Sequence, residues 1–169
     1  MEGFVQISPE ELDNAIKSIG SDWMLITADD KIHGRANAMT ASWGAMGVLW
    51  NKNICICFVR PQRYTYTLMK EENEFSIAFM GEEHRNALRF CGKESGRDRD
   101  KLSACGLTVN RELGVPVINE ADTVLVCKKL YEDDIREQSF LDKSLLINYT
   151  NQDYHRFYVC EIKEAYRKG

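Results

Sequence analysis

The stretch that decides the fold is NAMTASWGAMGVLW, residues 37–50, which lies between two apolar runs. Its small and β-branched residues are typical of a strand, but Asn37, Thr40, Ser42 and Trp43 interrupt any regular alternation. Small residues let a flat ligand approach the backbone, and amides and hydroxyls can bond the polar edge of a heteroaromatic ring. A bulged strand whose hydroxyls bond their own backbone, with Trp43 in the core, explains the same letters. The residues alone slightly favour this second interpretation.

Length, composition and net charge limit the class of protein. The chain has 169 residues, which suits one domain with a substantial core. Hydrophobic residues make up 44% and charged residues 28%, which excludes wholesale disorder. The net charge of −4 argues against nucleic acid as the main partner. No run is apolar enough to span a membrane and no signal peptide is recognisable, so we expect a cytoplasmic protein without a membrane partner.

The number and placement of the cysteines indicate free thiols rather than disulfides. The chain has six cysteines and no C-x-x-C pair. Most of them stand in apolar strings, so we expect buried thiols and no disulfides. Cys55 and Cys57 would share one face of a strand, but no histidine or second cysteine pair stands nearby, so no metal site is expected.

The segment SPEELDNAIKSIG, residues 8–20, predicts one opening helix. Ser8 and Glu11 form a capping-box pattern, Pro9 suits the first turn, and Gly20 marks the end. Its apolar residues recur at helical spacing and form one stripe: Leu12, Ala15, Ile16 and Ile19.

The remaining pattern predicts more strands than helices. Strands are expected at 23–28, 35–43, 53–59, 74–80, 123–135 and 154–166. Helices are expected within 60–73, 82–92 and 95–106, and residues 136–153 form an irregular excursion that is either a hairpin arm or a lid. The strand at 53–59 is nearly all apolar and should lie inside the sheet. The strands are spaced too irregularly for βαβ units, so the fold class is mainly β: a single domain over 1–169, an antiparallel barrel with appended helices.

Two loops carry groups that suit a phosphate. In RPQRYT, Arg60, Arg63 and Thr65 come at the start of a predicted helix, where guanidinium groups and free N–H groups favour a dianion. The alternative is a pair of surface arginines on a turn. In SGRDRDK, residues 95–101, a hydroxyl, a glycine N–H and Lys101 offer a similar set, although a capped helix start explains much of it.

Evidence for other chemistries is weak. His155 alternates with apolar residues in a predicted strand and either contacts a ligand or is half exposed. No nucleophile–base arrangement or pair of carboxylates in an apolar setting is recognisable, so we assign no catalytic residue and expect no hydrolase. The glycine-rich motifs of Rossmann and P-loop proteins are absent from the sequence.

Four motifs together resemble a known family. NAMTASWG, RPQRYTY, FCGKESGRDRDKLSACGLT and DYHRFYVCEI, in this order, are similar to the flavin reductase-like family of FMN-binding split barrels, and most of all to its flavoredoxin branch. The similarity runs from about residue 20 to 166. It implies a six-stranded, Greek-key-like split barrel, a homodimer, and one non-covalent FMN per subunit near the dimer interface.

The resemblance also implies the residues of a cofactor site. The isoalloxazine ring would lie against the first motif, and the phosphate would lie near Thr65 and Lys101. The implied cofactor-binding residues are Asn37, Met39, Thr40, Ala41, Ser42, Trp43, Arg60, Arg63, Tyr64, Thr65, Ser95, Gly96, Lys101 and His155. Cys160 stands where similar sequences often have glycine, so its side chain either narrows a pocket or packs in the core.

Three functions are compatible with this resemblance. The leading hypothesis is an FMN-dependent oxidoreductase that passes hydride from NAD(P)H to bound FMN, and electrons on to free flavin or another acceptor. The second is a flavoredoxin-like electron-transfer protein that works with a redox protein partner and uses no nicotinamide directly. The third is a module that binds flavin without turnover. A flavin supplies the redox chemistry itself, so the absence of an acid–base pair fits all three.

Overall fold

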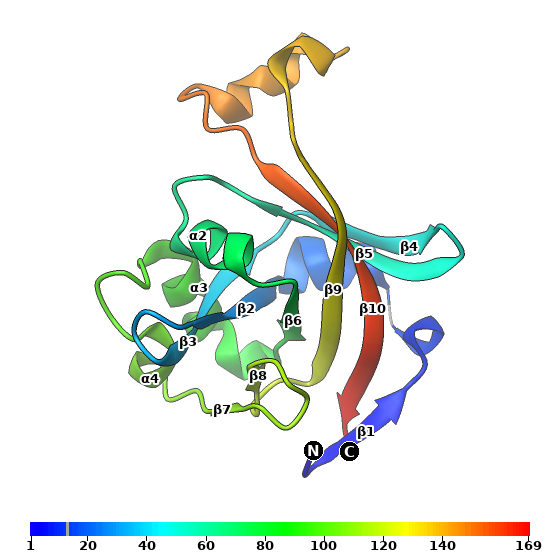
Figure 1. Ribbon diagram of the computed structural model, residues 1–169, viewed down its shortest axis with the longest axis vertical. Helices are drawn as coiled ribbons and strands as arrows, with labels where there is room; N and C mark the ends of the chain where they lie inside the picture. The colour runs from blue at the N-terminus through cyan, green and yellow to red at the C-terminus, as the bar shows by residue number, and fades with distance from the viewer. Residues whose placement is uncertain (13) are drawn as a thin grey trace.

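The computed structural model describes residues 1–12 and 14–169, and one antiparallel sheet of eight strands dominates it (Figure 1). The strands follow the order β3-β2-β6-β9-β10-β5-β4, with β1 added along β10. Their bounds are β1 Phe4–Ile7, β2 Met24–Asp30, β3 Arg35–Ala41, β4 Gly44–Leu49, β5 Lys52–Val59, β6 Glu74–Phe79, β9 Thr123–Asp134 and β10 Arg156–Lys168. A small second sheet pairs β7, Val109–Asn110, with β8, Val117–Ile118. The predicted class, mainly β and antiparallel, is confirmed.

Helices are short and lie between strands. The α-helices are α1 Ala15–Lys17, α2 Tyr64–Glu71, α3 Arg85–Lys93 and α4 Lys101–Ala104. Single turns of 3-10 helix cover Pro9–Glu11, Glu82–His84 and Glu137–Ser139, a longer one covers Lys143–Tyr149, and a π-helical turn covers Ser18–Asp22. Figure 1 shows α2, α3 and α4 gathered beside β2 and β3. Among the described residues, no helix has the length and apolarity needed to cross a membrane.

The sheet is buried on both faces where β2 passes through it. Met24 and Ile26 enter one core cluster, inside the curved sheet, whereas Leu25 enters a second cluster with Leu88 of α3. A strand covered on both faces favours apolar residues at consecutive positions, as in the Met24–Leu25–Ile26 run that opens β2. The first cluster also contains Cys160, which is fully buried beside Cys55. The cysteine therefore packs in the core. All six cysteines are free thiols, five of them buried as predicted, whereas Cys105 is partly exposed.

The prediction of one continuous helix over residues 8–20 is wrong. The capping box at Ser8 and Glu11 is present, but it caps only one 3-10 turn. The Asn14 side chain then accepts hydrogen bonds from the N–H groups of Ile16 and Lys17 and so caps a new helix, α1. An asparagine that bonds the local backbone in this way competes with a continuous helix. The run then continues past Gly20 to Asp22. Asp13 lies outside the described residues.

Two other differences concern strands. The sequence prediction missed β1, which pairs with β10, and β4, which contains Gly44 and Gly47 and pairs with β5. A Cβ at Gly44 would lie 2.7 Å from the carbonyl oxygen of Ile56, so the strand pairing itself requires this glycine. With β1 and β4 the sheet has eight strands, not the six that the resemblance implies. β3 ends the strand order, while the apolar β5 has a neighbour on each side as predicted.

Residues 136–153 form an arm that projects from the body between β9 and β10 (Figure 1). Its base is closed by a 2.8 Å hydrogen bond from the Ile135 N–H to the His155 carbonyl. Leu141 and Ile147 on the arm are exposed. The end of the arm next to the body carries Tyr149, which is buried. This end lies beside the cavity described next.

Candidate functional site

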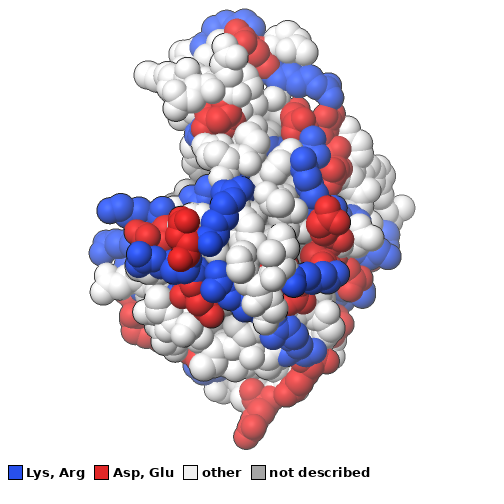
Figure 2. Space-filling model, turned by 60° about the vertical axis from the view of Figure 1, so that its left-hand side comes forward, with Lys and Arg blue, Asp and Glu red and all other residues white. Residues whose placement is uncertain are grey.

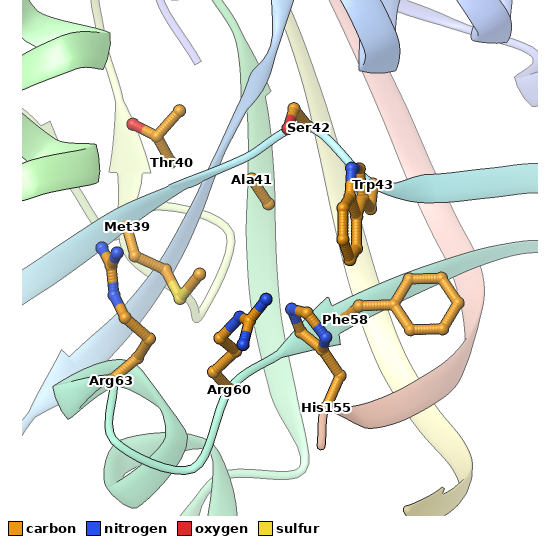
Figure 3. A pocket seen from close by; sticks show the side chains of 9 residues that line it. All are labelled: Met39, Thr40, Ala41, Ser42, Trp43, Phe58, Arg60, Arg63 and His155. Carbon is orange, nitrogen blue, oxygen red and sulfur yellow. The ribbon is translucent and has the colours of Figure 1, made fainter. Parts of the chain in front are cut away.

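The segment that opened the sequence analysis forms one wall of a cavity of about 210 Å³. We call it the strand cavity, because its lining comes mainly from β3 and β5 and the residues that follow them (Figure 3). It is lined by Met39, Thr40, Ala41, Ser42, Trp43, Phe58, Arg60, Arg63 and His155. In Figure 3, Trp43 and His155 project toward the same space from opposite sides.

A second cavity of about 160 Å³ lies next to the first and shares Arg63 with it. We call it the loop cavity, because the start of α2 and the loop before α4 enclose it. It is lined by Gln62, Arg63, Tyr64, Thr65, Lys93, Glu94, Ser95, Gly96 and Lys101. Arg63 is common to both linings, so the two cavities are neighbours.

Buried positive charge marks the loop cavity. Lys101 is only 3% exposed, and its Nζ donates to the carbonyl oxygen of Cys91 at 3.2 Å. The Arg63 guanidinium donates to the carbonyl oxygens of Gly92, at 2.6 Å, and Cys91, at 3.0 Å. Both cations therefore lie at the C-terminal end of α3, where the helix dipole favours them.

Burial lowers the pKa values of both cations. It lowers the pKa of Lys101 to about 8, and the nearby Arg63 guanidinium lowers it further in the same direction. Burial also lowers the pKa of Arg63. No carboxylate among the described residues forms an ion pair with either side chain. Lys101, which is buried, and Arg63, which is half-buried, therefore carry a desolvation cost that a bound anion would offset.

Asn37 connects the two walls from behind the cavities. It is buried, and its Nδ2 donates to the Thr65 hydroxyl at 2.8 Å. A Cβ on Gly96 would collide with the Asn37 amide oxygen and crowd the ring of Tyr64. Gly96 is therefore required at this point by close approach. The start of α2 has no side-chain cap, so the N–H groups of Tyr64 and Thr65 remain available at the loop cavity, whereas that of Tyr66 bonds the Arg63 carbonyl oxygen.

The hydroxyls of the first motif have different partners. Thr40 donates its hydroxyl to the carbonyl oxygen of Leu88 and so fastens β3 to α3. Ser42 has no hydrogen-bond partner among the described residues and lines the strand cavity. Trp43 is 45% exposed, so the interpretation that places it in the core is wrong. Its ring lies 5.2 Å from that of His155, centroid to centroid.

Arg60 contacts residues of the arm, and it does not line the loop cavity. It forms an ion pair with Asp153 and donates to the Asn148 carbonyl oxygen at 2.9 Å. Its guanidinium also lies 5.2 Å from the ring centroid of Tyr149. The expectation that Arg60 joins Arg63 and Thr65 around one anion therefore differs from the structure, because the Asp153 carboxylate holds Arg60 in the strand cavity.

The His155 side chain is buried, and its Nδ1 lies 2.9 Å from the hydroxyl of Tyr149. Burial lowers the pKa of His155 to about 4, and the positive charge of Arg60 acts in the same direction. The imidazole is therefore neutral at physiological pH.

The structure brings the sequence-predicted site residues together. Thirteen of the fourteen line one of the two cavities, and Asn37 supports Thr65 from behind. Sequence reasoning missed Phe58, Gln62, Lys93 and Glu94 in the linings and Tyr149 behind His155. Gln62 stands inside RPQRYT and could have been included on its position alone. No sequence motif marks Tyr149, because it lies in the irregular segment 136–153.

Surface charge adds little to this picture. Figure 2 shows basic side chains gathered at mid-height on the side that carries α2, α3 and α4, with acidic side chains among them. The described residues hold no group of three metal-ligating side chains.

Comparisons with known proteins identify the family. Residues 16–168 match the family model described as "Flavin reductase like domain". The Escherichia coli (strain K12) protein YddH, whose function is uncharacterised, is 30% identical over 115 residues, which cover 66% of this chain and 60% of YddH. The chain thus spans less than two thirds of that relative.

Two solved structures share the fold. The flavoredoxin of Methanosarcina acetivorans is 26% identical and superposes with a TM-score of 0.66, over 86% of this chain and 68% of that one. The FMN-binding domain of a flavin reductases-like enzyme from Shewanella baltica is 16% identical, with a TM-score of 0.68 over 98% of this chain and 77% of that one. The chain belongs to the flavin reductase-like family and has the split-barrel fold of that family.

Proposed function

We propose that the protein binds FMN across the two cavities, with the isoalloxazine ring in the strand cavity and the phosphate in the loop cavity. The observation that carries the proposal is that a cavity lined by small residues and aromatic rings lies next to one lined by the buried Lys101, with Arg63 common to both. A flat ring and an anionic tail on one molecule require such a pair of sites. FMN also appears in the name of the structurally similar Shewanella baltica domain.

The residues of the loop cavity fit a phosphate. Lys101 and Arg63 supply positive charge with no carboxylate partner among the described residues. Thr65 accepts a hydrogen bond from Asn37, so its own proton remains free to donate to a phosphate oxygen. The uncapped start of α2 adds backbone donors.

The proposed reaction is hydride transfer from NAD(P)H to bound FMN, followed by transfer of two electrons to free flavin or another acceptor. The flavin supplies this redox chemistry when bound, and the nicotinamide is oxidised as the flavin is reduced. The chain itself holds and orients the ring through residues 39–43 and His155, and holds the tail through the loop cavity. This division of labour needs no nucleophile and no acid–base pair.

A second candidate is an electron carrier that exchanges electrons with a protein partner. The similarity to a flavoredoxin favours it, at 26% identity over most of this chain. The two candidates share the same flavin site and differ in the electron donor. Reduction of the bound flavin by a nicotinamide would separate them.

We also propose that the protein forms a homodimer through the outer face of β4. Trp43 and Ala45 are exposed there, and Ile16 of α1, which is 86% exposed, lines the same surface hollow. β4 is also an edge strand. An exposed apolar patch on an edge strand is typical of a surface that another chain covers.

Titration with FMN and with riboflavin tests the cofactor assignment. Riboflavin has the same ring without the phosphate, so the two-cavity proposal predicts that FMN binds at least tenfold more tightly. In Lys101→Met this preference should shrink while riboflavin affinity stays the same. Equal affinity of the wild-type protein for FMN and riboflavin would contradict the phosphate site, and no binding of either would contradict the flavin site.

A further inference from the structure

The contact between Tyr149 and His155 links the arm to the strand cavity. Tyr149 ends the 3-10 turn Lys143–Tyr149 of the arm, whereas His155 precedes β10 and lines the cavity. The Tyr149 hydroxyl lies 2.9 Å from Nδ1 of His155, and both side chains are buried. The two rings meet edge to face with their centroids 5.6 Å apart.

The hydrogen-bonding capacities of the two groups decide where the imidazole proton lies. A neutral imidazole has one nitrogen that donates and one that accepts, and a phenol hydroxyl can do both. Burial raises the pKa of Tyr149, so the phenol keeps its proton. Two charged groups act on both side chains. The Arg60 guanidinium has only donors, and the Asp153 carboxylate accepts hydrogen bonds from Arg60 and Gln62 and none from Tyr149. Among the described residues, His155 Nδ1 is then the acceptor for the Tyr149 proton.

If Nδ1 accepts, the histidine proton lies on Nε2. This nitrogen has no hydrogen-bond partner among the described residues, yet it is not among their sealed, unpartnered polar atoms, which are Thr27 Oγ1 and Tyr158 Oη. It is therefore accessible, and the accessible space beside His155 is the strand cavity.

We propose that Tyr149 is a positioning residue that holds His155 as the neutral Nε2–H tautomer, so that His155 donates a hydrogen bond to an acceptor on the ring that occupies the strand cavity. The identity of that ring as a flavin rests on the proposed function, whereas the tautomer does not. A fixed N–H donor beside the ring edge stabilises the negative charge that a flavin gains on reduction.

The surroundings hold Tyr149 in place before any ligand binds. Its ring stacks on that of Tyr154 with centroids 4.9 Å apart and meets Phe140 at 5.9 Å. Arg60 fastens the same end of the arm through Asp153. A donor held by packing needs little reorganisation when a ligand arrives, which is the condition for a positioned hydrogen bond to be effective.

The tautomer can be measured without a cofactor. Long-range 1H–15N correlation spectra distinguish protonated from unprotonated ring nitrogens, and the chain has only three histidines, so His155→Gln identifies the relevant signals. Near neutral pH, the wild-type protein should show protonated Nε2 and unprotonated, hydrogen-bonded Nδ1. In Tyr149→Phe the Nδ1 resonance should move toward that of a free acceptor. A protonated Nδ1 in the wild-type protein, or an unmoved Nδ1 resonance in Tyr149→Phe, would overturn the inference.

Tyr154→Phe is the matched control. It removes a hydroxyl from the same aromatic cluster, but that hydroxyl contacts Glu137 and not His155. With FMN bound, Tyr149→Phe should have a more negative flavin midpoint potential than the wild-type protein, and Tyr154→Phe should match the wild type. Equal potentials in all three would overturn the donor role of His155. If no variant binds FMN, the proposed function fails, while the spectra still decide the tautomer.

Discussion

Asn37 and Thr65, 28 positions apart in the chain, are joined by a 2.8 Å hydrogen bond from the amide Nδ2 to the hydroxyl oxygen. The bond connects β3 to the first turn of α2 and is buried. Because the Thr65 oxygen accepts from Asn37, the Thr65 proton is directed away from β3 and is available to the loop cavity. A threonine oriented in this way can donate to a phosphate oxygen without rearrangement.

Thr65→Val should therefore weaken FMN binding. The variant keeps the shape but loses the hydroxyl and leaves the Asn37 amide unpaired, so a loss of about 1–3 kcal/mol of binding free energy is expected. Isothermal titration calorimetry with FMN measures it. Thr67→Val, an exposed position on the same helix, is the control and should bind normally. Wild-type affinity in Thr65→Val would refute the role of this hydroxyl.

Gly96→Ala should disturb the same contact from the loop. The new methyl group would collide with the Asn37 amide oxygen and crowd Tyr64, which costs about 1–3 kcal/mol of folding free energy as for other overpacked sites. Chemical denaturation monitors the loss, and FMN affinity should fall as well. Gly20→Ala is the control, because a Cβ there meets no atom within 4 Å. Equal stability of the two variants would show that the loop can move aside.

The pH dependence of binding should follow Lys101, whose pKa in the free protein is about 8. A bound phosphate stabilises the ammonium and raises its pKa, so FMN affinity should be constant just below pH 8 and fall as the pH rises above it. The free protein should respond with the opposite sign. Its Lys101 pKa lies below the ordinary value of 10.5, so the unfolded state binds more protons between about pH 8 and 10.5 and stability rises there.

Lys101→Arg checks this interpretation, because a guanidinium keeps its charge throughout this range. Its FMN affinity should be nearly independent of pH between 7 and 10. If the wild-type protein and Lys101→Arg lose affinity in parallel, another group titrates and Lys101 does not contact the phosphate.

Trp43→Ala should weaken binding of the flavin ring. Trp43 lines the strand cavity and Trp50 lies at the β4–β5 turn, and the two are 45% and 56% exposed. Loss of an aromatic contact costs about 0.5–1.5 kcal/mol beyond the buried area. Riboflavin titration isolates this contribution because it omits the phosphate. Trp50→Ala should bind riboflavin as the wild-type protein does, and equal losses in both variants would point to a nonspecific effect.

A charge on the outer face of β4 should dissociate the proposed dimer. Ala45→Arg places a guanidinium at an exposed strand position, whereas Val5→Arg does the same on β1, away from the β4 face. Light scattering coupled to size-exclusion chromatography should give a dimer for the wild-type protein and Val5→Arg, and a monomer for Ala45→Arg. A monomeric wild-type protein would contradict the proposed dimer outright.

Much of the fold could be predicted because the local signals agree with the tertiary environment. The strands that became β2, β6, β9 and β10 carry β-branched and aromatic residues, and their bounds differ from the prediction by only a few residues. β4 was missed because glycines at 44 and 47 weaken strand propensity, although the pairing with β5 requires Gly44. Glycine is required at position 44 because of the neighbouring strand β5, and no local sequence pattern reveals that contact.

The candidate site was predictable where motifs carry it and not where the arm does. The polar and cationic residues of the site stand within residues 37–43 and the two loops, so the sequence of these segments is enough to identify them. The roles of Arg60 and Tyr149 depend on Asp153 and His155, which the path of the arm brings beside them. The arm has no helical or strand period, so its path follows from tertiary packing alone.

Anaerobic mixing of the FMN-loaded protein with NADPH, and separately with NADH, tests the central claim most directly. The account predicts that the flavin absorption of the bound FMN bleaches with at least one donor, and that colour returns when free flavin or another electron acceptor is added. Bound FMN that stays oxidised with both donors, but is reduced by dithionite, would contradict the reductase and leave the electron carrier as the function of this site.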